Sequence, residues 1–213
     1  IVQTGAPDQP VVWRAWALDK RGVAHDVVLD APPPVARGSS IIGFNLKPKG
    51  RYGVHQFTED GSFLGIWDLR SGRRVTKIPL GNQFGAFSTF SPDETRVAFC
   101  TEAGRVIHVC EVGTGREVCT IRLTGRASIS GVLFSDNSRR LLTGDNWGGV
   151  QVWDATTGKL LRSAQAHRSA VTRFDYSGDN RFYISSSNDG TVQIWDARTD
   201  LPASPLLTET GGG

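Results

Sequence analysis

The sequence predicts an all-β protein built from repeated four-stranded antiparallel units, and four observations support this fold class. Short runs rich in β-branched and aromatic residues alternate with Gly, Pro, Asn and Asp turn signals. No amphipathic pattern of helical length competes with them. Glycine is abundant, at 25 residues, as many tight turns require. The same pattern also returns at intervals of 42 or 43 residues along most of the chain.

The repeat is clearest at its end, where a Trp-Asp pair closes each unit. The pairs are Trp67 and Asp68, Trp153 and Asp154, and Trp195 and Asp196. A worn copy carries Cys110 and Glu111 in their places, so that successive copies lie 43, 43 and 42 residues apart. Gly148 and Gly190 stand five residues before the last two Trp residues, where a tight turn is expected.

Repeats of about 40–45 residues that end in Trp-Asp resemble the WD-repeat β-propeller family. The resemblance covers about residues 41–200 and implies four-stranded antiparallel blades around a central axis. It predicts about four blades plus part of another, in an incomplete ring. The predicted blades span about 41–79, 84–122, 128–165 and 170–208.

Turn residues divide each predicted blade into four strands. The expected strands are Ile41–Lys47, Tyr52–Phe57, Phe63–Asp68, Arg74–Ile78, Phe84–Ser91, Arg96–Thr101, Val106–Glu111, Glu117–Arg122, Ser128–Ser135, Arg140–Gly144, Val150–Asp154, Lys159–Ser163, Ala170–Ser177, Arg181–Ser186, Thr191–Asp196 and Leu206–Thr208.

The two ends of the chain depart from the repeat. Residues 1–40 are predicted to hold a partial blade and a Pro-rich loop, with residues 1–10 as a loop and strands at Val11–Asp19 and Val23–Leu29. Residues 201–213 are predicted to hold the last outer strand and a flexible end. Because the chain begins at Ile1 and contains no Met, we expect the remaining blades to come from the same longer chain.

Composition argues against several classes of function. The 24 basic and 21 acidic residues are evenly spread and give a net charge of +3, too mild to predict nucleic-acid binding. No apolar run reaches the roughly 18 residues that a membrane span needs. The three cysteines show no metal-type spacing and are expected to be buried in a reducing, cytoplasmic compartment. No metal site and no cofactor is predicted.

The family resemblance implies a buried, hydrogen-bonded set in the last unit, formed by His167, Ser185, Asp189 and Trp195. In this set Asp189 would orient the imidazole ring, Ser185 would bridge, and the indole N–H would be satisfied. The third unit keeps Thr143 and Trp153 but has Gly125 at the His place and Trp147 at the Asp place. A Ser, a His and an Asp also suggest catalysis, but the surroundings of Ser185 lack a nucleophile elbow, so packing is the favoured interpretation.

Antiparallel strands bring the fourth-to-first and second-to-third connections to one end of the ring. In this family that end often docks proteins or peptides, so the favoured hypothesis is a non-catalytic protein-interaction scaffold. The alternatives are an enzymatic propeller with an active site at the channel mouth, and a structural spacer within a multidomain signalling protein. The candidate partner-binding residues are Arg126, Asn146, Trp147, Arg168 and Asn188.

Trp147 admits two hypotheses. An exposed aromatic in this turn would serve as an interface anchor, since Trp is among the residue types that most often dominate binding energy. A buried indole would instead fill the space left by the missing His and Asp of this unit, next to Gly125. Solvent exposure of the indole separates the two.

Overall fold

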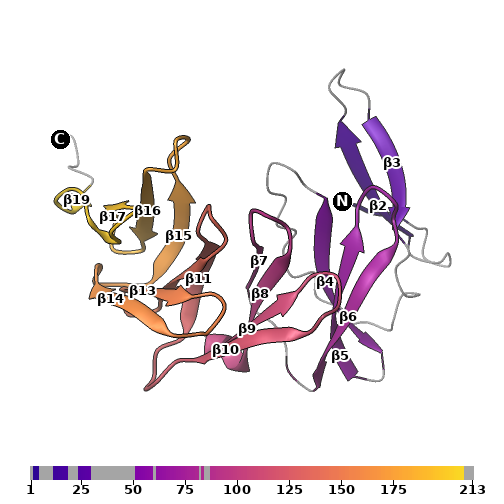
Figure 1. Cartoon of the computed structure of the whole chain (residues 1–213), viewed down its shortest axis with the longest axis horizontal. Helices are drawn as coiled ribbons and strands as arrows, with labels where there is room; N and C mark the ends of the chain where they lie inside the picture. Colours follow the sequence, from indigo (N-terminus) through magenta and orange to yellow (C-terminus); the bar gives the residue numbers. More distant parts are fainter. Residues whose placement is uncertain are drawn as a thin grey trace.

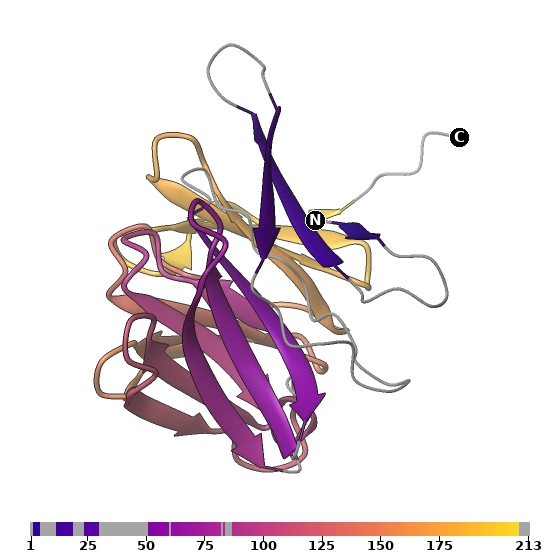
Figure 2. The same cartoon turned by 90° about the vertical axis from the view of Figure 1, so that its right-hand side faces the viewer.

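The chain forms an open arc of five antiparallel sheets (Figures 1 and 2). The computed structural model describes residues 2–4, 12–18, 24–29, 51–59, 61–81, 83 and 87–208. Within these ranges the only helical element is a single 3₁₀ turn at Glu102–Gly104. The fold class predicted from the sequence is therefore confirmed, as an all-β propeller arc in which the described sheets do not close into a ring.

The sheets follow the order of the chain, and we number them I to V. Strands of one sheet pair with their sequence neighbours, as in the repeated meander predicted above. Sheet I contains β1 (Val2–Thr4), β2 (Val12–Leu18) and β3 (Ala24–Leu29); sheet II contains β4 (Tyr52–Glu59), β5 (Gly61–Asp68) and β6 (Arg74–Gly81); sheet III contains β7 (Ser88–Phe90), β8 (Arg96–Thr101), β9 (Val106–Glu111) and β10 (Glu117–Arg122); sheet IV contains β11 (Ile129–Phe134), β12 (Arg140–Asp145), β13 (Gly149–Asp154) and β14 (Leu160–Gln165); sheet V contains β15 (Val171–Tyr176), β16 (Phe182–Ser187), β17 (Thr191–Asp196), β18 (Leu201–Pro202) and β19 (Leu207–Thr208).

Two segments differ from the expected pattern. The prediction of a loop over residues 1–10 was wrong at Val2–Thr4, which pairs with Val12–Arg14 and extends sheet I. The outer strand of sheet V is split into β18 and β19, both paired with β17. Its interruption follows from Pro202 and Pro205, because proline cannot donate a ladder hydrogen bond. The expected strand at Ile41–Lys47 lies outside the described residues.

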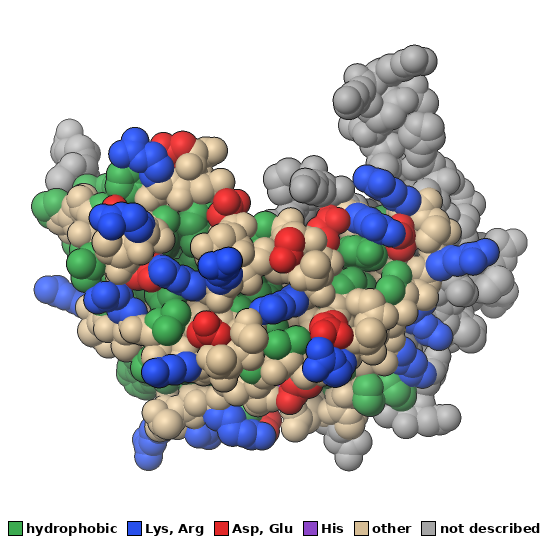
Figure 3. Space-filling model, viewed as in Figure 1, with side chains coloured by type: hydrophobic (Ala, Val, Ile, Leu, Met, Phe, Trp, Pro, Cys, Tyr) green, Lys and Arg blue, Asp and Glu red, His purple; other side chains and the backbone are tan. Residues whose placement is uncertain are grey.

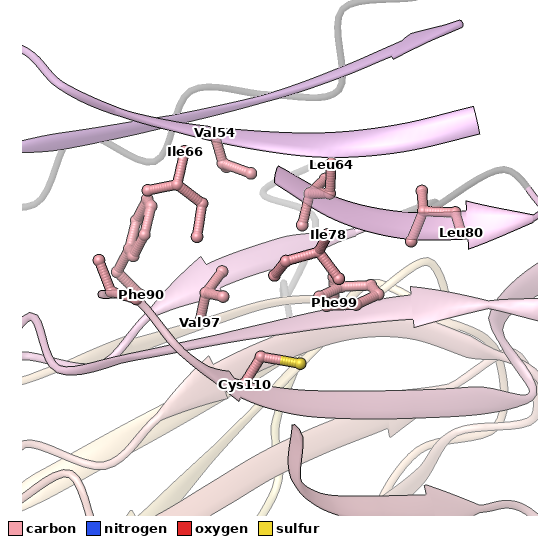
Figure 4. Close-up of a cluster of buried hydrophobic side chains, with 10 residues drawn as sticks. Val54, Leu64, Ile66, Ile78, Leu80, Phe90, Val97, Phe99 and Cys110 are labelled. Atoms are coloured by element: carbon pink, nitrogen blue, oxygen red, sulfur yellow. The ribbon is translucent and has the colours of Figure 1, made fainter. Parts of the chain in front are cut away.

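Each inner sheet is apolar on both faces, so it packs against the sheet before it and the sheet after it. Alternation along a strand produces this, because successive side chains point to opposite faces. In β8, Val97 and Phe99 pack toward sheet II, whereas Ala98 and Cys100 pack toward sheet IV. Figure 4 shows the first of these interfaces, with Val54, Leu64, Ile66, Ile78 and Leu80 of sheet II facing Phe90, Val97, Phe99 and Cys110 of sheet III.

Sheets IV and V approach each other very closely at Gly144. A Cβ atom built on Gly144 would lie 2.4 Å from the Cβ of Val171, far inside the normal contact distance. Ser130 reinforces this junction, since its hydroxyl donates a hydrogen bond of 2.7 Å to the carbonyl oxygen of Val171. The lack of a side chain at Gly144 therefore sets the spacing between the two sheets.

The far face of sheet V keeps the apolar pattern of sheet IV but has no sheet packed on it among the described residues. Leu142 of β12 is 1% exposed because it contacts sheet V, as do Val150 and Val152. Its counterpart 42 residues later, Ile184 of β16, is 38% exposed. The same repeat position is thus core in one sheet and surface in the next.

We predict that alanine has very different effects at these two matched positions. Leu142→Ala should lower the free energy of unfolding by about 2–5 kcal/mol, because it opens a cavity between two sheets. Ile184→Ala should lower it by about 1 kcal/mol or less, since an exposed strand position loses mainly β-propensity. Urea unfolding followed by tryptophan fluorescence measures both values, and equal losses would contradict this description of the core.

Candidate functional site

A chain of hydrogen bonds runs beneath the loop end of sheet V and holds the loops in place. The indole Nε1–H of Trp195 donates to Ser185 Oγ at 3.0 Å, and Ser185 Oγ lies 2.8 Å from His167 Nε2. His167 Nδ1 lies 2.6 Å from Thr191 Oγ1, whose hydroxyl donates to Asp189 Oδ1 at 2.5 Å. The structure thus brings together the four residues of the predicted set and adds Thr191 to them.

The order of donors in this chain defines the state of the imidazole ring. The Thr191 hydroxyl donates to the carboxylate, so its oxygen accepts from Nδ1–H of His167. Nε2 is then the acceptor for the Ser185 hydroxyl. The expectation that Asp189 itself orients the ring needs correction, because its oxygen is 3.9 Å from Nδ1 and Thr191 lies between them.

Burial and hydrogen bonding tune the two ionisable groups of this chain. Burial lowers the pKa of His167 below its ordinary value of 6.5, although the negative charge of Asp189 opposes the shift. Burial alone would raise the pKa of Asp189, but hydrogen bonds from the Thr191 hydroxyl and from the N–H groups of Arg168 and Thr191 lower it to about 2. At neutral pH the His167 imidazole in this hydrogen-bond chain is therefore neutral and Asp189 is a carboxylate.

The Ser185 hydroxyl is not placed for nucleophilic chemistry. Its residue is fully buried, and His167 is 3% exposed. Both bonding directions of the hydroxyl are already used inside the sheet, by Trp195 and by His167. These contacts give Ser185, His167 and Trp195 a role in packing the sheet.

Sheet IV builds an equivalent chain from different residues, which sequence comparison missed. Trp153 Nε1–H donates to Thr143 Oγ1 at 2.9 Å, and the Thr143 hydroxyl donates to Gln151 Oε1 at 3.0 Å. Gln151 Nε2 then donates to Asp145 Oδ2 at 2.9 Å. In both sheets an indole N–H is thus linked to a carboxylate, in sheet IV through a hydroxyl and an amide and in sheet V through Ser185, His167 and Thr191.

Gly149 makes this substitution sterically feasible. It stands at the position of Thr191 in the following repeat, and a Cβ atom there would lie 2.3 Å from Asp145 Oδ2. In sheet V the corresponding glutamine, Gln193, bonds instead to the carbonyl oxygens of Ile194 and Ser204. The missing His and Asp of the third unit are thus replaced by Gln151 and Asp145.

Because Asp145 supplies the carboxylate, Trp147 is free to face solvent. Trp147 is 60% exposed, the highest value among the exposed large hydrophobic side chains of the described residues. The hypothesis that it fills the space beside Gly125 was therefore wrong. Gln151 and Asp145 form the network expected at that place.

The backbone of the Trp147 turn is pinned on every side. Asp145 Oδ1 accepts the N–H groups of Trp147 and Gly149 at 2.8 and 2.9 Å. The Trp147 carbonyl oxygen accepts Gln165 Nε2 at 2.6 Å. Gly148, with a φ of 88°, accepts from the N–H groups of Ala166 and His167. A side chain at Gly148 would collide with the His167 carbonyl oxygen at 2.2 Å, so this close approach requires glycine.

The other four candidate residues lie in this turn or in loops at the same end of sheets IV and V, and all four are exposed. Asn146 is tied to Ser128, since its Oδ1 accepts the Ser128 N–H at 2.9 Å and its own N–H donates to the Ser128 carbonyl. Arg168 donates its backbone N–H to Asp189 Oδ2 at 2.6 Å. Arg126 lies in the loop that enters sheet IV, and Asn188 in the second-to-third turn of sheet V.

Comparisons with known proteins agree with this architecture. The family model "WD domain, G-beta repeat" matches residues 117–154 and 158–196. This part of the chain carries two WD40 repeats. Each matched WD40 repeat begins at or just before the outer strand of one sheet and ends with the third strand of the next, so the sequence repeat links neighbouring sheets. A search of curated proteins gave no match.

Two solved structures share the fold. The computationally designed Ika8 protein superposes with a TM-score of 0.63 at 24% identity, covering 93% of this chain. The chain spans 58% of the length of Ika8. The computationally designed Ika4 protein superposes with a TM-score of 0.55 at 24% identity, covering 75% of this chain and 98% of Ika4. At this level of identity the likeness concerns the fold alone.

The Asp residues of the WD40 signature cap the turns at the opposite end of the sheets. Asp154 Oδ1 accepts the N–H groups of Thr156 and Thr157 at 2.9 and 2.7 Å, and Asp196 Oδ1 accepts those of Arg198 and Thr199. The same bonds lower the pKa of both carboxyl groups. Asp68 caps its turn in the same way, while Trp67 is buried.

A second surface lies on the inner side of the arc. Figure 3 shows this side hollowed, and a cavity of about 1000 Å³ is lined there by β7, β11, β15 and the turns that follow them. None of the five candidate residues lines this cavity.

No group of three or more His, Cys, Asp or Glu in the described segments is arranged to hold a metal ion. No helix found there is long and apolar enough to cross a membrane.

We predict that the indole acceptor in sheet IV contributes measurably to stability. Thr143→Val should lower the free energy of unfolding by about 1–3 kcal/mol, because Trp153 and Gln151 each lose a buried partner. Thr143→Ser keeps the hydroxyl, so its free energy of unfolding should lie close to that of the unmodified chain. Chemical denaturation of the two variants in parallel checks this, and similar stability of the Val and Ser variants would contradict it.

We also predict a pH dependence that originates at His167. The folded state holds this ring neutral, whereas the unfolded chain protonates it below about pH 6.5. The unfolded state then binds more protons, so the His167 contribution is present above about pH 6.5 and is lost as the pH falls through that value toward the lower folded pKa. Urea midpoints at about pH 7.5 and 5.5 should differ more for the unmodified chain than for His167→Gln. If the difference between the two midpoints is the same in both proteins, the pH dependence arises from groups other than His167.

Proposed function

We propose that this chain is a non-catalytic protein-interaction scaffold that binds a protein or peptide partner through the loop end around Trp147. WD40 repeats generally serve as protein-interaction scaffolds and are generally non-enzymatic, and the specific end proposed here goes beyond that generality. The exposure of Trp147 on a pinned turn is the observation that carries the proposal. Hydrogen bonds from Asp145, Gln165 and the Ala166 and His167 N–H groups hold the backbone of this turn, so the position of the exposed residue is fixed before a partner binds.

The energetics of interfaces support a tryptophan in this role. Large aromatic side chains contribute most of the binding energy at many interfaces and lose little conformational entropy when they are already held in place. The rigid sheets below the turn fix its position, and loops on such scaffolds commonly carry binding residues. The free thiols of Cys100, Cys110 and Cys119 fit the reducing, cytoplasmic setting that we propose for this interaction.

The test begins with a library of random displayed peptides selected on the full chain of 213 residues. Affinities of the selected peptides are then measured for the unmodified chain and for Trp147→Ala. We expect this change to weaken binding by about 2 kcal/mol or more. It should alter the free energy of unfolding by only about 0.5 kcal/mol, because the indole packs against little of the core.

Trp153→Ala is the matched control, because Trp153 is buried six residues away. It should cost about 3–5 kcal/mol of stability. A failure to select any peptide, or unchanged peptide affinity in Trp147→Ala, would overturn the proposal. A large loss of stability in Trp147→Ala would also contradict it, since the residue would then be part of the core.

A further inference from the structure

Two arginines in the loops next to the Trp147 turn have guanidinium groups without a partner. Within the described part of the chain, the side chains of Arg126 and Arg168 make no hydrogen bond and no ion pair, and both residues are exposed. Other arginines of this end are engaged. Arg105 donates to the Gly125 carbonyl oxygen at 2.8 Å, and Arg122 pairs with Glu102 at 3.3 Å.

The carboxylates at the same end are already used. Asp145 accepts two backbone N–H groups and the Gln151 amide, and it is 5% exposed. Asp189 accepts the Arg168 N–H and the N–H and hydroxyl of Thr191. The charged groups without a partner around the Trp147 turn are therefore the two guanidinium groups.

The two arginines approach the Trp147 turn from opposite sides. Arg126 stands two residues before Ser128, which bonds to Asn146, the residue preceding Trp147. Arg168 follows His167, whose N–H donates to the carbonyl oxygen of Gly148, the residue after Trp147. An indole thus lies between two loops that each carry one unpaired cation, across the junction of sheets IV and V.

We propose that this surface binds an acidic peptide segment, with an apolar side chain on Trp147 and Asp or Glu side chains on Arg126 and Arg168. The proposal rests on the function proposed above and names the class of its partner. A guanidinium presents planar paired donors that match a carboxylate, and an unpaired one is available for this at no cost to the fold. A cationic partner would gain a contact with the indole face but would meet two like charges beside it.

Charge reversal tests the proposal with the peptides selected on the full chain. We expect the selected sequences to be enriched in Asp and Glu next to a large apolar residue. Arg126→Glu and Arg168→Glu should each weaken their binding by about tenfold or more, and both changes together by more than either alone. Arg139→Glu is the matched control, because Arg139 is an exposed residue of sheet IV in a first-to-second turn at the opposite end. It should leave affinity unchanged.

Two synthetic peptides of equal length provide an independent probe, one alternating glutamate with leucine and the other alternating lysine with leucine. The glutamate peptide should bind more tightly, and its advantage should disappear in the double Arg variant. Selected peptides that lack acidic residues but still lose affinity in Trp147→Ala would overturn this inference and leave the scaffold function standing. Acidic peptides whose affinity does not respond to Arg126→Glu or Arg168→Glu would also overturn it. Selected peptides whose affinity is unchanged in Trp147→Ala would overturn the proposed function itself.

Discussion

The stacking of two-faced sheets is the constraint on which the rest of this structure depends. A sheet with apolar residues on both faces cannot bury them alone, so sheets III and IV bury both faces because each lies between two neighbours. Leu141 and Leu142 illustrate this, because adjacent residues of β12 belong to two different core clusters. The WD40 matches are staggered against the sheets for the same physical reason. A sequence unit that spans two sheets ties each sheet covalently to the next.

Bringing Trp indoles into these interfaces creates a second requirement, because each buried N–H needs an acceptor. Sheets IV and V both meet it with a series of hydrogen bonds that begins at a hydroxyl and ends at a carboxylate at the loop end. In sheet IV, Thr143 accepts the hydrogen bond from the indole and Gln151 links it to Asp145. In sheet V, Ser185 accepts it, and His167 and Thr191 link it to Asp189. The carboxylate also accepts backbone N–H groups from its turn, so the core of each sheet and the shape of its loop end are coupled.

This coupling explains how a large aromatic side chain comes to lie on the surface of a rigid turn. In sheet V the turn residue Asp189 serves the network, and its side chain is committed to the loop. In sheet IV the carboxylate of the network comes from Asp145, two residues before Trp147. The side chain at position 147 is therefore not needed in the network. The proposed binding surface is therefore a by-product of how this one sheet satisfies its buried indole.

The sequence alone determined the order and approximate bounds of the strands in residues 51–208, apart from β18. Alternating apolar residues and turn glycines are local signals, so β8, β9, β10 and β17 begin and end at the predicted residues. The arc, the family and the turn that carries Trp147 followed from the same period. Tertiary structure decided the rest. The pairing of β1 with β2 has no local signal in a polar segment. The partnership of Gln151 with Asp145 arises from the register of β12 against β13 and from the space left by Gly149. For that reason the exposure of Trp147 could not be predicted from its position in the repeat. A repeat specifies the turn but not which neighbouring side chain fills the space beneath it.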